Sequence, residues 1–126
     1  MPFVNDRALD LGLNVFDVEA NRLDICSSEP TTFSQATTGG TVSLGNKTLS
    51  TGTNSPAAGS PNGRSVTIPS FSDGNVTNTG TASHWALTDT VNSRLLATGA
   101  LAASQSVTSG NTFSLTSFTI RYPAAV

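Results

Sequence analysis

Short stretches of alternating apolar and polar residues recur along the second half of the chain, separated by turn sequences. Between residues 63 and 122 the turns come about every ten residues, for example at Ser72–Asn75 and Thr108–Asn111. Alternation with a period of two is the pattern of a strand with one buried face. Turns at this spacing are typical of small antiparallel folds. We therefore predict a mainly β fold, a small antiparallel β-sandwich or jelly-roll-like domain.

The amino-acid composition agrees with many short strands. The 126 residues include 19 Thr, 17 Ser, 11 Gly and 10 Asn, against 6 Lys plus Arg and 8 Asp plus Glu. Thr favours strands, whereas Gly, Asn and Ser favour turns, and so few charges disfavour a helical bundle or a coiled coil. A chain of this length is expected to form one domain with a single core.

Three regions of this one domain differ in character. Residues 1–30 form an acidic segment, in which two Arg face six Asp and Glu, or 2 minus 6 equals −4. Residues 31–63 are rich in Thr, Ser, Gly, Asn and Pro, which predicts loops and turns. Residues 64–126 contain the clearest strand patterns and are expected to form the β-sandwich core.

The acidic segment allows two interpretations before its first strand. Leu9, Leu13 and Phe16 lie on one helical face, which predicts a short helix over about 6–17. However, alternate residues from Leu9 to Val15 are all apolar, which favours an extended strand instead. Next, residues 21–26 alternate and predict the first strand, with Leu23 and Ile25 on one face.

Within the loop-rich region, only residues near 41–49 have a strand-like pattern. Residues 51–63 contain two prolines and three glycines. We expect no regular structure there, because proline cannot donate to a strand ladder and glycine weakens a strand. A loop of this length is a candidate contact arm.

In the core region, strands are predicted at 64–68, 83–88, 94–101, 105–107 and 112–115. A turn is expected at Ser72–Asn75, and the strands before and after Thr108–Asn111 are expected to pair as a hairpin. The final stretch changes face, because Phe113 and Leu115 have odd numbers whereas Phe118 and Ile120 have even numbers. A β-bulge or a crossing between sheets at Thr116–Ser117 would return both sets to the core.

Charge and hydropathy exclude several classes of function. The net charge of −2 and the dispersed arginines do not form a basic surface for nucleic acid. The apolar stretches are too short for a membrane span, and the first residues lack the pattern of a signal peptide. A single cysteine, Cys26, permits no disulfide within the chain, and we expect it to be a small buried residue.

No motif for catalysis, for a cofactor or for a metal is evident. His84 is the sole histidine, and a hydrolase would need it beside a nucleophile and an orienting carboxylate such as Asp73 or Asp89. We expect instead a strand-surface or half-buried histidine and no catalytic residue. Trp85 and Tyr122 are candidates for stacking on a sugar ring, although a tryptophan at an inward strand position is more often part of the core.

Parts of the chain resemble a group of small structural proteins of tailed bacteriophages. The similar stretches are 21–30, Gly80–Asp89 (GTASHWALTD), Arg94–Leu101 (RLLATGAL), Val107–Leu115 (VTSGNTFSL) and Ser117–Ile120. They cover about half of the chain and contain no catalytic residue. The resemblance implies a β-rich protein on the surface of the phage particle, made in the host cytoplasm, either a head decoration protein or a tail or fibre component.

The expected function is therefore non-enzymatic, most simply the decoration and stabilisation of a capsid. The expected partners are the major capsid protein or other virion proteins and further copies of this chain, with a trimer as one arrangement, but neither nucleic acid nor a membrane. The charged residues that are candidates for assembly contacts are Asp6, Arg7, Asp10, Lys47 and Arg64. The alternative is a carbohydrate-binding adhesion module of a phage tail or fibre.

Overall fold

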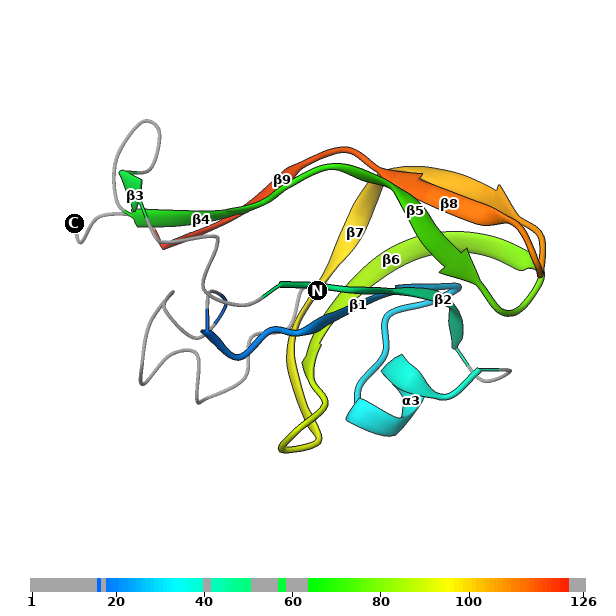
Figure 1. Cartoon of the computed structure of the whole chain (residues 1–126), viewed down its shortest axis with the longest axis horizontal. Helices are drawn as coiled ribbons and strands as arrows, with labels where there is room; N and C mark the ends of the chain where they lie inside the picture. Colours follow the sequence, from blue (N-terminus) through cyan, green and yellow to red (C-terminus); the bar gives the residue numbers. More distant parts are fainter. Residues whose placement is uncertain (1–15, 17, 40–41, 51–56, 59–63, 123–126) are drawn as a thin grey trace.

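The computed structural model describes residues 16, 18–39, 42–50, 57–58 and 64–122. The described part is mainly β, as predicted (Figure 1). Its elements, in chain order, are β1 (Arg22–Cys26), α3 (Phe33–Thr37), β2 (Ser43–Thr48), β3 (Ala57–Ala58), β4 (Arg64–Ile68), β5 (Phe71–Val76), β6 (Gly80–Asp89), β7 (Arg94–Val107), β8 (Thr112–Leu115) and β9 (Phe118–Tyr122). No helix among these residues is long and apolar enough to cross a membrane.

The strands form two antiparallel sheets. The larger sheet has six strands in the order β7-β6-β1-β2-β5-β8, and the smaller has three in the order β3-β4-β9. The larger sheet is strongly curled (Figure 1). Residues from both sheets, including Leu23, Leu87 and Ile68, belong to one hydrophobic core.

Two chain segments pass together from the larger sheet into the smaller one. In the smaller sheet, β4 pairs with β9. In the larger sheet, β5 pairs with β8. The chain runs directly from β4 into β5 and from β8 into β9. In Figure 1 the paired segments continue as one long curved ribbon. The change of sheet between β8 and β9 falls at Thr116–Ser117, where the apolar residues change face. The predicted crossing is confirmed: Phe113 and Leu115 are buried, and Phe118 and Ile120 pack against the same core.

Strand β1 is in the middle of the larger sheet and is buried on both faces. It pairs with β2 on one side and with β6 on the other. Leu23 and Ile25, on one face, belong to the main core, as predicted. On the opposite face, Asp24 and Cys26 are also fully buried. An alternating strand that is buried on both sides needs a cover for its more polar face.

Helix α3, which was not predicted, belongs to that cover. Its Ala36 packs with Cys26 of β1, Ala86 of β6 and Leu95 of β7 in a second hydrophobic cluster. The side chain of Thr32 accepts a hydrogen bond from the Gln35 backbone N–H and caps the helix. Thr-x-x-Gln is a known start signal of helices, so residues 32–35 of the sequence already indicated this helix.

Several other predictions for the strands need correction. The expected turn at Ser72–Asn75 is wrong, because these residues lie within β5. Gly74 serves close packing instead, since a Cβ at this position would collide with the ring of Phe113. The stretch 105–107 is the end of the single strand β7, and the turn at 108–111 does not join paired strands. Strands β7 and β8 are opposite edges of the sheet, connected by a hydrogen bond of 2.9 Å from Gln105 Nε2 to the Ser114 carbonyl.

In residues 1–63 some of the predicted elements are confirmed and others need correction. Strand β2 confirms the pattern seen near 41–49, and β1 confirms the first strand. Residues 31–63 are not loops throughout, since they contain α3 and β2, and the pair Ala57–Ala58 forms a short strand beside β4. The rest of the expected 51–63 loop lies outside the described residues. So does the segment assigned to a helix or strand over 6–17, except for the buried Phe16.

A substitution at Gly99 tests the packing between strands β6 and β7. A Cβ there would lie 2.5 Å from Cζ2 of Trp85, so Gly99→Ala is expected to lower the free energy of unfolding by about 2 kcal/mol. Urea denaturation followed by circular dichroism measures the change. Gly80→Ala is the control, because its Cβ would meet the flexible end of Leu44 at 3.0 Å and should cost much less. Equal stability of the two variants would contradict this packing.

Candidate functional site

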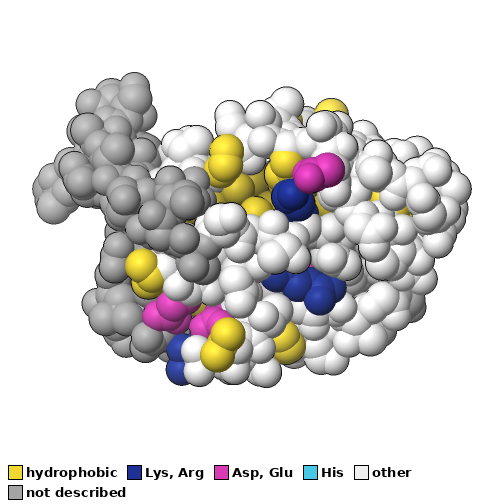
Figure 2. Space-filling model, in the orientation of Figure 1, with side chains coloured by type: hydrophobic (Ala, Val, Ile, Leu, Met, Phe, Trp, Pro, Cys, Tyr) yellow, Lys and Arg dark blue, Asp and Glu magenta, His cyan; other side chains and the backbone are white. Residues whose placement is uncertain are grey.

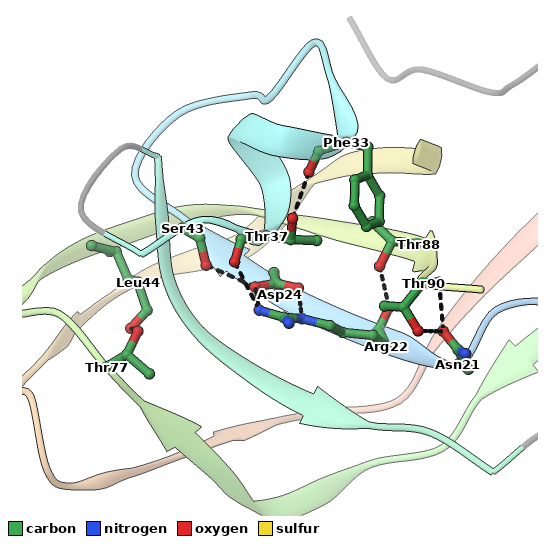
Figure 3. A network of polar contacts seen from close by, with 10 residues as sticks. All are labelled: Asn21, Arg22, Asp24, Phe33, Thr37, Ser43, Leu44, Thr77, Thr88 and Thr90. Atoms are coloured by element: carbon green, nitrogen blue, oxygen red, sulfur yellow. Dashed lines mark hydrogen bonds and ion pairs between the residues drawn. The ribbon is translucent and has the colours of Figure 1, made fainter. Parts of the chain in front are cut away.

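A network of polar contacts lies on the covered face of β1 (Figure 3). Two nitrogens of Arg22 donate to the two carboxylate oxygens of Asp24, Nε to Oδ1 at 2.7 Å and Nη2 to Oδ2 at 2.9 Å. Nη2 also donates to the Thr37 carbonyl at 3.0 Å, and the Ser43 hydroxyl donates to Asp24 Oδ2 at 2.7 Å. This Arg22–Asp24 network thus connects β1 with the end of α3 and the start of β2.

The electrostatics of the network indicate a structural role. Burial raises the pKa of the Asp24 carboxyl, while the hydrogen bonds from Arg22 and Ser43 oppose that rise. Both carboxylate oxygens already accept hydrogen bonds within the chain. Asp24 is fully buried, so its geometry suits the attachment of the covering segment to the sheet rather than the binding of a substrate.

Cys26, next to this network, is buried as predicted. Burial, with a smaller contribution from the negative charge of Asp24, raises the pKa of its thiol to about 12. Because the thiolate is the reactive form, we expect Cys26 to react slowly in the folded protein near neutral pH.

His84 is half-buried, and its contacts do not activate a nucleophile. Its Nδ1 lies 2.8 Å from the hydroxyl of Ser83. That hydroxyl donates its hydrogen to the Ser27 carbonyl at 2.9 Å, so it accepts from Nδ1–H. The two candidate orienting carboxylates make their contacts elsewhere, Asp73 with Lys47 and Asp89 with its own turn.

Trp85 connects the two sheets. Its ring stacks on Phe118 of β9, with centroids 4.4 Å apart and planes at 29°. It also lies against Gly99 of β7, at the position where a larger residue would collide. The side chain of Tyr122, its predicted partner for sugar stacking, lies outside the described part of the chain. A role for Trp85 in binding glycans therefore stays a prediction.

Of the predicted assembly contacts, only Lys47 has a described side chain. Its ammonium pairs with Asp73 at 2.8 Å and lies 5.8 Å from the centroid of the Phe71 ring. The hydrogen bond from Lys47 lowers the pKa of Asp73. Arg64 begins β4, but its side chain is not described, and the other three candidates, Asp6, Arg7 and Asp10, lie outside the described residues.

The turn between β6 and β7 presents an exposed apolar residue that the sequence analysis did not single out. Between β6 and β7, Asp89 Oδ1 accepts from the backbone N–H groups of Val91 at 3.0 Å and Asn92 at 3.3 Å. Asn92 Nδ2 donates to the other oxygen of Asp89 at 2.8 Å, and Asn21 accepts two hydrogen bonds from Thr90. The turn is therefore held firmly, yet Val91 at its tip is 81% exposed.

Beside this turn is a hollow of about 360 Å³, with Val18, Leu49 and Val91 among its lining residues. Glu19 and Asp89 also line it, and Glu19 pairs with Arg94 at 3.5 Å. Figure 2 shows acidic, basic and apolar side chains close together at the lower edge of the visible face. We call Val18, Glu19, Val91 and Arg94, together with this hollow, the turn patch. The sequence signal for the turn patch was Val91, a β-branched apolar residue within a polar turn.

Other kinds of site find less support in the described residues. No group of three or more His, Cys, Asp or Glu side chains in these ranges is arranged to hold a metal ion. A hollow of about 340 Å³ beside Lys47 is lined by Pro69 and Phe71, and one of about 300 Å³ lies between the edges β7 and β8. Neither of them is lined by Val18 or Val91, the exposed large apolar side chains of the described residues.

The role of the Arg22–Asp24 network can be tested with paired substitutions. Asp24→Asn is expected to lower the free energy of unfolding by about 2–3 kcal/mol, because Arg22 loses its charge partner and is only 27% exposed. Asp73→Asn, which removes the exposed partner of Lys47, should leave stability close to that of the wild type. Chemical denaturation of both variants measures the difference, and comparable losses would contradict a structural role specific to Asp24.

The burial of Cys26 predicts its reactivity. At pH 8, iodoacetamide should leave the folded protein unmodified, since burial shields the thiol and its pKa of about 12 keeps it protonated. The same reagent should alkylate the protein fully in strong denaturant. Intact mass spectrometry follows the reaction, and fast labelling of the folded chain would show that the cover over β1 opens readily.

No protein-family model, curated protein or solved structure matches this chain. Its function is therefore inferred from its own residues: the Arg22–Asp24 network, the stack of Trp85 on Phe118 and the turn patch.

Proposed function

We propose that the protein is a non-enzymatic structural component of a bacteriophage particle, most simply a decoration protein that stabilises the capsid through contacts between subunits. The observation that carries this proposal is Val91, an 81% exposed apolar side chain at the tip of a turn held by several hydrogen bonds. An apolar group in a fixed position loses little conformational freedom when a partner covers it. The resemblance noted for residues 21–30, 80–89, 94–101, 107–115 and 117–120 is the reason for proposing a phage particle.

The arrangement of the fold also supports a role as a rigid building block. The two sheets share one core, and Trp85 and Phe118 stack between them. The Arg22–Asp24 network fastens the covering segment to the middle of the larger sheet. On a particle with many copies, weak identical contacts add up through multivalency, so that no single contact has to be strong.

The alternative, a carbohydrate-binding module of a tail or fibre, has less support. A stacking platform needs a free aromatic face, and the ring of Trp85 is half-buried and stacked on Phe118. The contacts of the ring therefore favour a structural role over a sugar platform.

The test is to locate the protein on intact particles of the phage whose genome encodes it. Mass spectrometry of purified particles should detect the chain in many copies, and cryo-electron microscopy should place it on the outside of the head. Density on a tail or fibre tip would favour the alternative. A chain that is produced in infected cells but is missing from purified particles would refute the proposed function.

A further inference from the structure

The two edge strands of the larger sheet face each other without pairing. Strand β7 is one edge and β8 is the other, and the curl of the sheet brings the end of β7 beside β8 (Figure 1). A side-chain hydrogen bond of 2.9 Å, from Gln105 Nε2 to the Ser114 carbonyl, connects them. A hollow of about 300 Å³ lies between the two strands, lined by residues 101–105 and 114–116. We call this hollow and its lining residues the edge slot.

The edges of the slot lie farther apart than paired strands do. Paired strands are about 4.8 Å apart, and backbone groups then reach one another directly. Here a glutamine side chain reaches the Ser114 carbonyl instead of a backbone N–H. In a strand, the N–H and C=O of one residue point to the same edge, so the Ser114 N–H also faces the slot.

The β7 wall of the slot is a bulge. Ala100 pairs with His84 of β6 and Gln105 pairs with Ala82, so residues 101–104 lie opposite the single residue Ser83. Their backbone is therefore outside the regular ladder between β6 and β7. The side chains at 102–104 are two alanines and a serine, and all three residues are exposed. Such small side chains leave room for another backbone to approach this wall.

The walls of the slot lack the usual protection of exposed strand edges. Natural proteins block such edges with charged residues or proline, because a free edge accepts a strand from another chain. The described residues that line the slot are all uncharged, and none is proline. The floor is apolar, since Leu115 belongs to the main core and Leu101 packs against it. The slot thus combines two strand edges with an apolar floor.

These walls restrict what can fill the slot. A strand that pairs with β7 on one side and with β8 on the other needs both of its own backbone edges free. Every described strand of this chain already pairs with a neighbour in its own sheet. A folded second copy therefore cannot donate one of these strands. An extended segment that belongs to no sheet has two free edges, and an uncharged lining suits uncharged side chains.

We propose that the edge slot binds an extended, uncharged peptide segment of another polypeptide, which enters as an additional strand between β7 and β8. Main-chain hydrogen bonds to both walls hold the segment, and its alternate side chains pack on Leu101 and Leu115. Gln105 releases the Ser114 carbonyl when the strand enters. The inference goes beyond the proposed function, because the slot follows from the sheet alone.

The test measures the binding of synthetic peptides to the full chain. The first probe is acetyl-Thr-Val-Thr-Val-Thr-Val-Thr-Lys-Lys-amide, whose lysines follow the strand and keep it soluble, and a second probe has alanine in place of valine. Hydrogen exchange followed by NMR should show slower exchange of backbone amides in both walls, 101–105 and 114–116, when a probe binds. N-methylation of every second residue removes the donors from one edge of a probe and should weaken its binding by about tenfold or more.

Substitutions in the slot test its location. Ala103→Lys should weaken peptide binding by about tenfold or more, because it places a charged side chain at the β7 wall. Thr67→Lys is the matched control, since it introduces the same residue at an exposed position of β4 and should bind as the wild type does. Gln105→Ala should bind about threefold more tightly, because no side chain then competes for the Ser114 carbonyl. Fluorescence anisotropy of a labelled probe measures the affinities, and circular dichroism checks that each variant is folded.

Four results would overturn the inference: no slowing of exchange with either probe, slowing at one wall only, equal binding by Ala103→Lys and the wild type, or self-association of the wild type that Ala103→Lys abolishes. The last result would assign the slot to a segment of this chain instead. No phage particle is used, so these outcomes are separate from those for the proposed function. A chain that binds a probe in the slot but is missing from particles refutes only the proposed function.

Discussion

The fold depends on how strand β1 is buried. It lies in the middle of the larger sheet, and both its apolar face and its more polar face are covered. An unpaired carboxylate on such a strand would cost several kcal/mol, so Asp24 requires the two nitrogens of Arg22 and the hydroxyl of Ser43. The same guanidinium binds the Thr37 carbonyl at the end of α3. One ion pair thus satisfies the buried charge and attaches the segment that buries it.

A second constraint comes from the paired segments that cross between the sheets. Because β4 pairs with β9 and β5 pairs with β8, the smaller sheet is a continuation of the larger one, and the two share a core. Trp85 and Phe118 stack at the place where the sheets meet, and Gly99 leaves the space that the indole ring needs. The result is a single packed block.

Several polar side chains that could take part in chemistry are instead engaged in contacts that stabilise this block. Asp24 fastens the cover, Asp89 shapes a turn, and the Ser83 hydroxyl beside His84 donates to the Ser27 carbonyl. In the described part of the chain, every buried side-chain nitrogen and oxygen has a hydrogen-bond partner. The turn patch differs, because its hydrogen bonds leave an apolar group in solvent. Covering such a surface with a partner would lower the free energy, which is why we propose a contact function.

The sequence by itself determined the local features: the mainly β class, the position of β1, and the change of face at Thr116–Ser117. These follow from a period of two residues, which any strand with a buried face must show. Only the tertiary structure decided which strands are neighbours, since pairing joins residues far apart in the chain. It therefore placed β7 and β8 at opposite edges, made Gly74 a packing residue under Phe113, and buried Asp24 beside Arg22. It also decided that Val91 stands exposed beside a hollow, because the turn, Val18 and Leu49 meet only in the folded chain.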